Sequence, residues 1–152
     1  RDTGAGHSPL HCAAANNRYK CIRELARLRA DVDRPASRSL STSLHWAARN
    51  GHVESVETLV QVNATLDARD WGKNTPLMYA ARHGRVTALE RLIELKADLR
   101  AQNSDGKNAL FHAAETGQTA TCMKLTELGL GATEVLLYGG TAADFADARG
   151  HA

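Results

Sequence analysis

Seven histidines and three cysteines are the residues of this 152-residue chain that could ligate a metal or act as a nucleophile or general base. Zinc sites hold their ligands at short, regular spacings, and a histidine identifies a site only within such a motif. Cys12, Cys21 and Cys122 are odd in number and lack a C-x-x-C spacing. We therefore predict no metal site and no disulfide framework, and we interpret the cysteines as small buried side chains in a reducing compartment.

The sequence also lacks the motifs of common catalytic sites. It contains no glycine-rich phosphate loop and no G-x-S-x-G turn for a nucleophilic serine. Carboxylates at helical spacing, such as Glu54 and Glu57, belong to the charged side of an expected helix, where solvation explains them. We predict that residues 1–152 bind no cofactor and have no catalytic activity by themselves.

The composition indicates which elements position these side chains. The chain is 43% hydrophobic but only 5% aromatic, with 26 alanines and 18 leucines against 7 aromatic residues. Because alanine buries little area, such a core favours helices that pack closely at small residues. No run of 18 apolar residues exists, which predicts no membrane span. The net charge of +2 is too mild to favour a nucleic-acid-binding protein.

A seven-residue pattern recurs in phase along the chain. Its copies start at positions 8, 42, 75, 108 and 141, so the spacings are 34, 33, 33 and 33 residues. The fifth copy is degenerate, but the others begin with Ser, Thr or Asn and end with Ala-Ala. A period in this range indicates stacked units that bury their apolar faces only against their neighbours. The four clear copies are Ser8–Ala14, Thr42–Ala48, Thr75–Ala81 and Asn108–Ala114.

These segments resemble the ankyrin repeat, whose signature T-P-L-H-x-A-A is followed by Gly-His at a period of about 33 residues. The resemblance covers essentially the whole chain. It implies an all-α ankyrin-repeat solenoid of stacked helix-turn-helix units with short β-hairpin or turn fingers. It further implies one domain over residues 1–152, with repeats at about 3–36, 37–69, 70–102 and 103–135 and a partial capping repeat at 136–152.

Each part of the repeat has a local physical reason. Ser, Thr or Asn before the first helix can cap its free N–H groups, and Pro suits the next position. Glycine between the two helices supplies a positive φ, and Asn17, which replaces it in the first unit, tolerates the same conformation. The 34-residue spacing places one extra residue in segment 35–41, where we expect a loosened first finger.

Four of the seven histidines occupy motif positions. His11 and His45 stand at the histidine of T-P-L-H, and His52 and His151 stand at the histidine of Gly-His. The resemblance implies that they are structural, since the family uses the first of these positions to hydrogen-bond neighbouring backbone. The three histidines that remain are His7, His83 and His112.

The resemblance implies a protein–protein interaction scaffold whose partners bind a concave surface. That surface is formed by the finger tips and the exposed side of each first helix. Function must therefore be argued from the side chains at those positions and not from the fold. The candidate partner-binding residues are Arg38, Ser39, Trp46, Arg49, Asn50, Trp71, Lys73, Asn74, Tyr79, Arg82, His83, Asp105, Lys107, His112 and Glu115.

The second and third units concentrate the residue types that dominate interface hot spots. Trp46, Trp71 and Tyr79 fall there, with Arg49 and Arg82 at exposed first-helix positions. We hypothesise a partner protein or peptide that carries acidic and apolar residues. For Trp71, partner contact and packing on a neighbouring finger both stay open, whereas for Trp46 packing at the edge of the core is favoured.

Two further function classes stay open. The first residue is Arg1 and not Met, so we expect the chain to be part of a larger protein. These repeats could then recruit substrate for, or regulate, an enzyme whose catalytic domain lies outside this segment. Nucleic-acid binding through the same basic residues is less favoured. We expect a monomeric domain in the cytoplasm, with the nucleus as the alternative, and no contact with a membrane.

Overall fold

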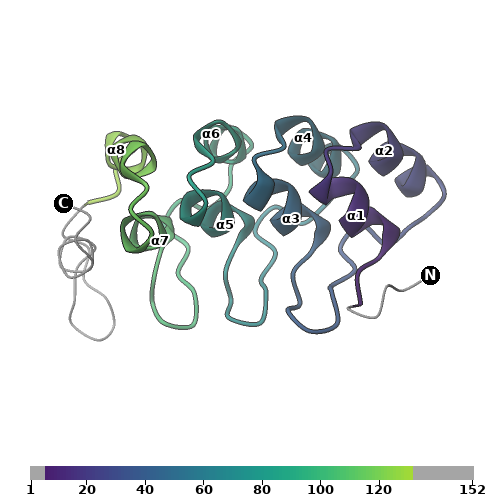
Figure 1. Cartoon of the computed structure of the whole chain (residues 1–152), viewed down its shortest axis with the longest axis horizontal. Coiled ribbons are helices and arrows are strands. Elements are labelled where there is room, and N and C mark those ends of the chain that lie inside the picture. The colour runs from purple at the N-terminus through teal and green to yellow at the C-terminus, as the bar shows by residue number, and fades with distance from the viewer. Residues whose placement is uncertain (1–5, 132–152) are drawn as a thin grey trace.

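The computed structural model describes residues 6–131 and places eight short helices along this stretch. Figure 1 shows them in two rows, with the odd-numbered helices in one row and the even-numbered helices in the other. Contacts follow the same order, because each helix packs on its partner and on the next helix of its own row. The all-α solenoid of helix pairs is confirmed. The helices are α1 Pro9–Ala15, α2 Tyr19–Arg27, α3 Ser43–Asn50, α4 Val53–Gln61, α5 Pro76–Arg82, α6 Val86–Glu94, α7 Ala109–Glu115 and α8 Thr119–Glu127.

Polar residues precede the first helix of every unit, as predicted. In the third unit the Thr75 hydroxyl accepts the backbone N–H of Met78 at 3.4 Å. In the fourth unit the Asn108 side chain accepts the N–H of Phe111 at 3.2 Å. These bonds satisfy N–H groups that have no partner inside the helix.

The first two units use histidine for the same purpose. The Nδ1 atoms of His11 and His45 accept the backbone N–H of Ser8 at 3.1 Å and of Thr42 at 3.0 Å. Because Nδ1 accepts, the proton of each neutral ring is on Nε2, which donates it to a carbonyl of the following finger. The acceptors are the carbonyls of Ser41 for His11 and of Asn74 for His45, each at 3.0 Å. Both rings are buried, and burial lowers the pKa of each imidazole. The structural role predicted for His11 and His45 is confirmed.

The turns between paired helices adopt the left-handed conformation. Gly51, Gly84 and Gly117 have φ values of 76°, 65° and 70°, and Asn17 has a φ of 53°. Each of these turns reverses the chain within a few residues, which requires the positive φ that glycine and asparagine tolerate best. The prediction for Asn17 is confirmed.

The core is built from alanine and leucine, as the composition predicted. The alanine pairs of the motif are buried in all four units, so the first helices approach each other closely. Leucines of the second helices, such as Leu59, Leu92 and Leu125, are fully buried between neighbouring units. Each unit therefore depends on its neighbours to cover its apolar face.

Tight fingers extend from the first-helix row (Figure 1). The second and third fingers close with backbone bonds from Asp70 to Asn74 and from Asn103 to Lys107. In the first finger the N–H of Ala36 donates to the carbonyl of Ser41, so this finger is one residue wider than the other two. The extra residue lies in segment 35–41, as the sequence predicted. That finger is not loosened, however, because a second backbone bond, from residue 40 to residue 36, tightens it at 2.9 Å.

Backbone bonds also tie each finger to the next. The N–H of Trp71 donates to the carbonyl of Ser39, and the N–H of Ser104 donates to the carbonyl of Gly72, each at 2.9 Å. The fingers thus form one connected edge along the first-helix row, which holds the side chains beside it in fixed register.

The expected burial of the cysteines is wrong for two of them. Cys12 and Cys21 are exposed, Cys122 is half-buried, and all three are free thiols. For Cys21 the reason lies in the stacking, since Ser55 and Ala88, which repeat its position in the next two units, are buried. No described segment packs on the corresponding face of the first unit. The fifth, partial repeat at 136–152 lies outside the described residues.

Candidate functional site

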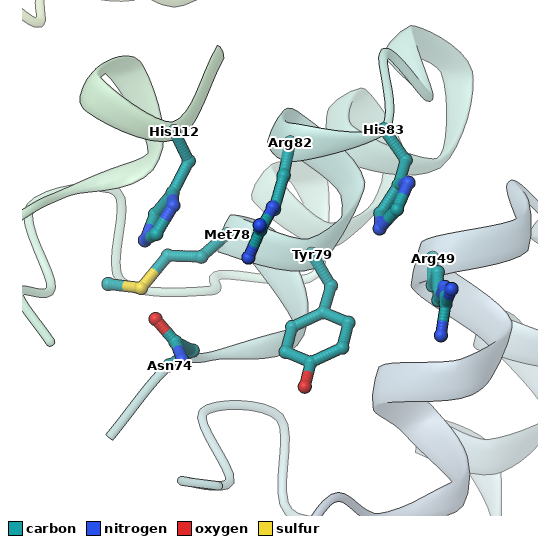
Figure 2. A pocket seen from close by; sticks show the side chains of 7 residues that line it. All are labelled: Arg49, Asn74, Met78, Tyr79, Arg82, His83 and His112. Atoms are coloured by element: carbon teal, nitrogen blue, oxygen red, sulfur yellow. The ribbon is translucent and has the colours of Figure 1, made fainter. Parts of the chain in front are cut away.

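Six of the predicted binding residues line one pocket beside the fingers, between α3, α5 and α7. The pocket has a volume of about 280 Å³. Figure 2 shows the side chains that surround it, which come from three consecutive units. We call it the first-helix pocket, and it is lined by Arg49, Asn74, Met78, Tyr79, Arg82, His83 and His112.

Tyr79 forms a rigid aromatic wall of the pocket. Its hydroxyl donates to the Asp70 carboxylate at 2.9 Å, and its ring meets His45 edge-on with the centroids 5.1 Å apart. Burial and the Asp70 charge raise the pKa of Tyr79 to about 12, so the phenol stays neutral at physiological pH. The ring presents a half-buried apolar surface whose position is fixed at both ends.

Asn74 is fixed in place by hydrogen bonds on every side. Its backbone N–H donates to Asp70 at 2.7 Å, and its side-chain amide donates to the same carboxylate at 3.1 Å. Its carbonyl accepts from His45, and its side-chain oxygen accepts from Asn103 at 2.8 Å. Asn74 therefore helps to shape the pocket but is already occupied as a hydrogen-bonding group.

Arg49 and Arg82 are the exposed cations at the pocket. The Arg49 guanidinium lies 5.6 Å from the centre of the Trp46 ring. Neither arginine forms an ion pair with a carboxylate of residues 6–131. Their charges reach His83, whose pKa is lowered first by burial and then by Arg49 and Arg82. The pocket is thus a locally positive site whose cations are available to a ligand.

His112 is the most deeply buried titratable group of the pocket, with 6% of the residue exposed. Its Nε2 atom lies 3.3 Å from the amide nitrogen of Asn103. Its Nδ1 atom has no hydrogen-bond partner among the residues that the structure describes. Burial lowers the pKa of His112 to about 4, with Arg82 and Lys107 acting in the same direction.

The two tryptophans occupy different environments. Trp46 is half-buried, donates from Nε1 to the Ser41 hydroxyl at 3.2 Å and meets the ring of His7 edge-on, which fits packing at the edge of the core. Trp71 is 64% exposed at its finger tip. Its backbone bonds to the neighbouring finger, but most of the indole faces solvent.

The structure places the other predicted residues outside the pocket. The side chains of Ser39 and Asn50 are occupied by internal hydrogen bonds, to Ser41 at 2.6 Å and to the Ala15 carbonyl at 3.0 Å. Two further predicted residues, Lys107 and Glu115, form a largely buried ion pair beside α7, with Nζ and Oε1 3.0 Å apart. The exposed finger-tip residues are Arg38, Lys73 and Asp105.

Sequence reasoning missed Met78, which lines the pocket. The available signal was a departure from the motif, because Met78 stands where His11 and His45 stand in the first two units. Residues 6–131 contain no group of three His, Cys, Asp or Glu side chains placed to hold a metal ion. Within the same stretch, none of the helices has the length and apolar character needed to cross a bilayer.

Comparison with known proteins extends the resemblance seen in the motif. A family model described as ankyrin repeats (3 copies) matches residues 1–70 and 63–134. The palmitoyltransferase Hip14 of Drosophila melanogaster is 41% identical over 61 residues, which are 40% of this chain and 10% of that protein. The palmitoyltransferase AKR1 of Lachancea kluyveri is 39% identical over 63 residues, which are 41% of this chain and 8% of that protein. The chain thus spans a tenth or less of the length of these curated relatives.

Proposed function

The chain belongs to the ankyrin-repeat family of protein-interaction modules, and on that premise we propose that it binds a partner protein or peptide at the first-helix pocket and the adjacent finger tips. The partner segment carries acidic and apolar residues. It lies along the second, third and fourth units, where the six predicted residues that line the pocket come together.

One observation carries this proposal: exposed cations without carboxylate partners stand beside fixed aromatic surfaces. Arg49 and Arg82 are exposed, and no ion pair within residues 6–131 neutralises them. Tyr79 is held by Asp70 and His45, so little conformational entropy is lost when a ligand packs on it. Arginine and aromatic residues of this kind supply most of the binding energy in many interfaces.

Trp71 extends the proposed surface beyond the pocket. Its indole is 64% exposed, while its backbone is bonded to the first finger. A large apolar ring held in solvent on an ordered finger is a typical anchor for an apolar partner residue. Acidic groups of the partner would speed the encounter through the arginine charges, and apolar groups would add affinity.

The relatives favour a more specific setting as the second candidate. Their printed names identify enzymes, and the matched region is only a tenth or less of each one. We propose as the alternative that these repeats recruit substrate to, or regulate, a catalytic domain elsewhere in a larger protein. We also place the chain in the cytoplasm, because Cys12 and Cys21 are exposed and unpaired, as suits a reducing compartment.

Selection from a displayed random-peptide library on the purified protein tests the proposal. We expect the selected peptides to be enriched in Asp or Glu next to apolar residues, and their binding to weaken as salt rises. The variant Arg49→Glu/Arg82→Glu should lose at least about tenfold in affinity, since each arginine contact to a carboxylate is a charge-assisted bond.

The matched control carries the same charge change elsewhere. Lys20→Glu/Arg23→Glu alters two exposed cations of α2, outside the pocket. Equal loss of binding in both double variants would show a diffuse charge effect and refute the site. Binding of the selected peptides that does not change in Arg49→Glu/Arg82→Glu would also refute it.

A further inference from the structure

We propose that the first-helix pocket is a carboxylate-binding site, in which the Nδ1–H of His112 and the guanidinium of Arg82 bind the side chain of an aspartate or glutamate. This inference rests on the proposed function and names the group of the partner that enters the pocket. It comes from three steps: the tautomer of His112, its missing acceptor, and the charge around it.

The tautomer follows from the orientation of Asn103. The Asn103 side-chain oxygen accepts the backbone N–H groups of Asp105 and Lys107, both at 3.0 Å. The other end of the amide is therefore the NH₂ group, and it donates one hydrogen to Asn74 at 2.8 Å. Its second hydrogen points to Nε2 of His112 at 3.3 Å. An NH₂ group can only donate, so Nε2 is the acceptor, and the proton of a neutral imidazole is on Nδ1.

The Nδ1–H group of His112 has no acceptor within residues 6–131, although only 6% of the residue is exposed. A buried donor without a partner is costly, and most native structures avoid one. His112 lines the first-helix pocket, and Figure 2 shows its ring beside Arg82. An acceptor supplied by a ligand would complete the hydrogen bonding of this group.

The surrounding charges favour an anion as that acceptor. Arg82 and Arg49 are cations at the rim, and Lys107 is paired with Glu115 at 3.0 Å. The two carboxylates whose charges act on His112 are already engaged, because Glu115 is the partner of Lys107 and Asp70 accepts from the side chains of Tyr79 and Asn74. A carboxylate has two oxygens, so one can accept from Nδ1–H while the other accepts from the guanidinium.

His112 need not be charged for this role. Burial keeps its pKa near 4, so it is a neutral donor at physiological pH. The groups that act on it are Arg82, Lys107, Glu115 and Asp70, with the two cations opposing protonation and the two carboxylates favouring it. A bound carboxylate adds a third negative charge, so binding should raise the pKa of His112.

The test uses a matched pair of small probes, N-acetyl-L-glutamate methylamide and its glutamine analogue. They differ only by a carboxylate against an amide. Each is titrated into isotope-labelled protein, and the His112 ring and Arg82 side-chain signals are followed by NMR. We expect saturable shifts of both groups with the glutamate probe, and at least about tenfold weaker binding of the glutamine probe. Before any probe is added, a long-range ¹H–¹⁵N spectrum should show the His112 proton on Nδ1.

Two variants and one control locate the effect. Arg82→Gln and His112→Phe should each weaken the glutamate probe at least about fivefold. Arg82 is exposed, and phenylalanine suits position 112 because its equivalents in the second and third units are Trp46 and Tyr79, so both variants should fold. Arg23→Gln, an exposed change on α2, should bind like wild type.

Several outcomes would overturn the inference while leaving the proposed function intact. Equal binding of the two probes would do so, as would a His112 proton on Nε2. Binding of N-acetyl-L-alanine tighter than that of the glutamate probe would indicate that the ligand is a chain-terminal carboxylate. Tighter binding of methyl phosphate would indicate a phosphorylated residue. Either result would refute an aspartate or glutamate side chain as the ligand. Selected peptides that still depend on Arg49 and Arg82 after such a result would show that the surface binds a partner without the carboxylate site.

Discussion

Acidification should destabilise this protein through His112, by an amount that the structure sets. The pKa of His112 is lowered from its ordinary value of 6.5 to about 4 by burial. The unfolded chain therefore binds a proton more readily than the folded chain between these values. The stability that this group provides is present in full above pH 6.5, falls as pH decreases, and is lost completely only below pH 4.

The size of the loss follows from the difference between the two pKa values. One pKa unit corresponds to about 1.4 kcal/mol, so His112 should account for about 2 kcal/mol of lost unfolding free energy by pH 5 and about 3 kcal/mol by pH 4. His11 and His45 also have pKa values lowered by burial, so the whole protein should lose more than this. The contribution of His112 must be isolated by a variant.

Urea denaturation from pH 7.5 to pH 4 measures it, with His112→Phe as the variant that cannot titrate. Wild type and variant should follow parallel curves above pH 7 and separate below pH 6.5, with the variant losing about 3 kcal/mol less by pH 4. An NMR titration of the His112 ring gives the folded-state pKa directly. Parallel stability curves over the whole range, or a measured pKa near 6.5, would refute the claim that the pocket holds a neutral, desolvated histidine.

Three further substitutions test the binding surface and the stacking. Trp71→Ala should change the unfolding free energy by no more than about 0.5 kcal/mol, because the indole is 64% exposed, but should weaken a selected peptide about tenfold in a fluorescence polarisation assay. Unchanged peptide affinity would remove Trp71 from the surface. Leu92→Ala should cost about 2–5 kcal/mol in urea denaturation, because its side chain is fully buried between units; a loss as small as that of Leu128→Ala, which removes a partly exposed side chain, would contradict the stacking argument. Gly84→Ala should cost about 1 kcal/mol or more, since its φ is +65° and an added Cβ would meet the Gln118 side chain; a melting temperature equal to that of wild type would show that the turn can rearrange.

The repeat made much of the fold predictable from the sequence. The period located the helix pairs, the caps and the inter-helix turns, and it anticipated the left-handed Asn17 and the extra residue of the first finger, although not that this finger stays tight. These features depend on local backbone conformation, which the residue types at the motif positions determine directly. The exposure of Cys21 was not predictable in the same way, because it depends on whether another unit covers that side of the helix and not on the residue itself.

The candidate site was predictable only as a set of positions. The motif register indicated that Arg49, Tyr79 and Arg82 share one side of the solenoid, and the structure brings them to one pocket. It could not indicate that Asp70 fixes Tyr79, or that the Asn103 amide of the third finger reaches His112. Both contacts join a finger to the first helix that follows it, and they depend on which side chains stand at non-motif positions and on their rotamers, about which a repeat pattern carries no information.

One departure from the motif accounts for how the pocket arises. In the second unit, His45 accepts at Nδ1 from its own helix start and donates from Nε2 to the next finger. In the third unit that position is Met78, whose sulfur lies 3.4 Å from the N–H of Thr75 and can accept it, but a thioether has no proton to donate onward.

In the third finger, Asn103 accepts two backbone N–H groups of its own finger and donates to the Asn74 side chain of the preceding finger. An amide used in this way has one hydrogen left, and that hydrogen lies at Nε2 of His112. The replacement of a bridging histidine by methionine therefore does two things at once. It places a flexible apolar side chain on the pocket wall. It also removes the imidazole bridge to the next finger, so that the Asn103 amide joins Ser104 in linking the two fingers and fixes the proton of His112 on the nitrogen without a partner.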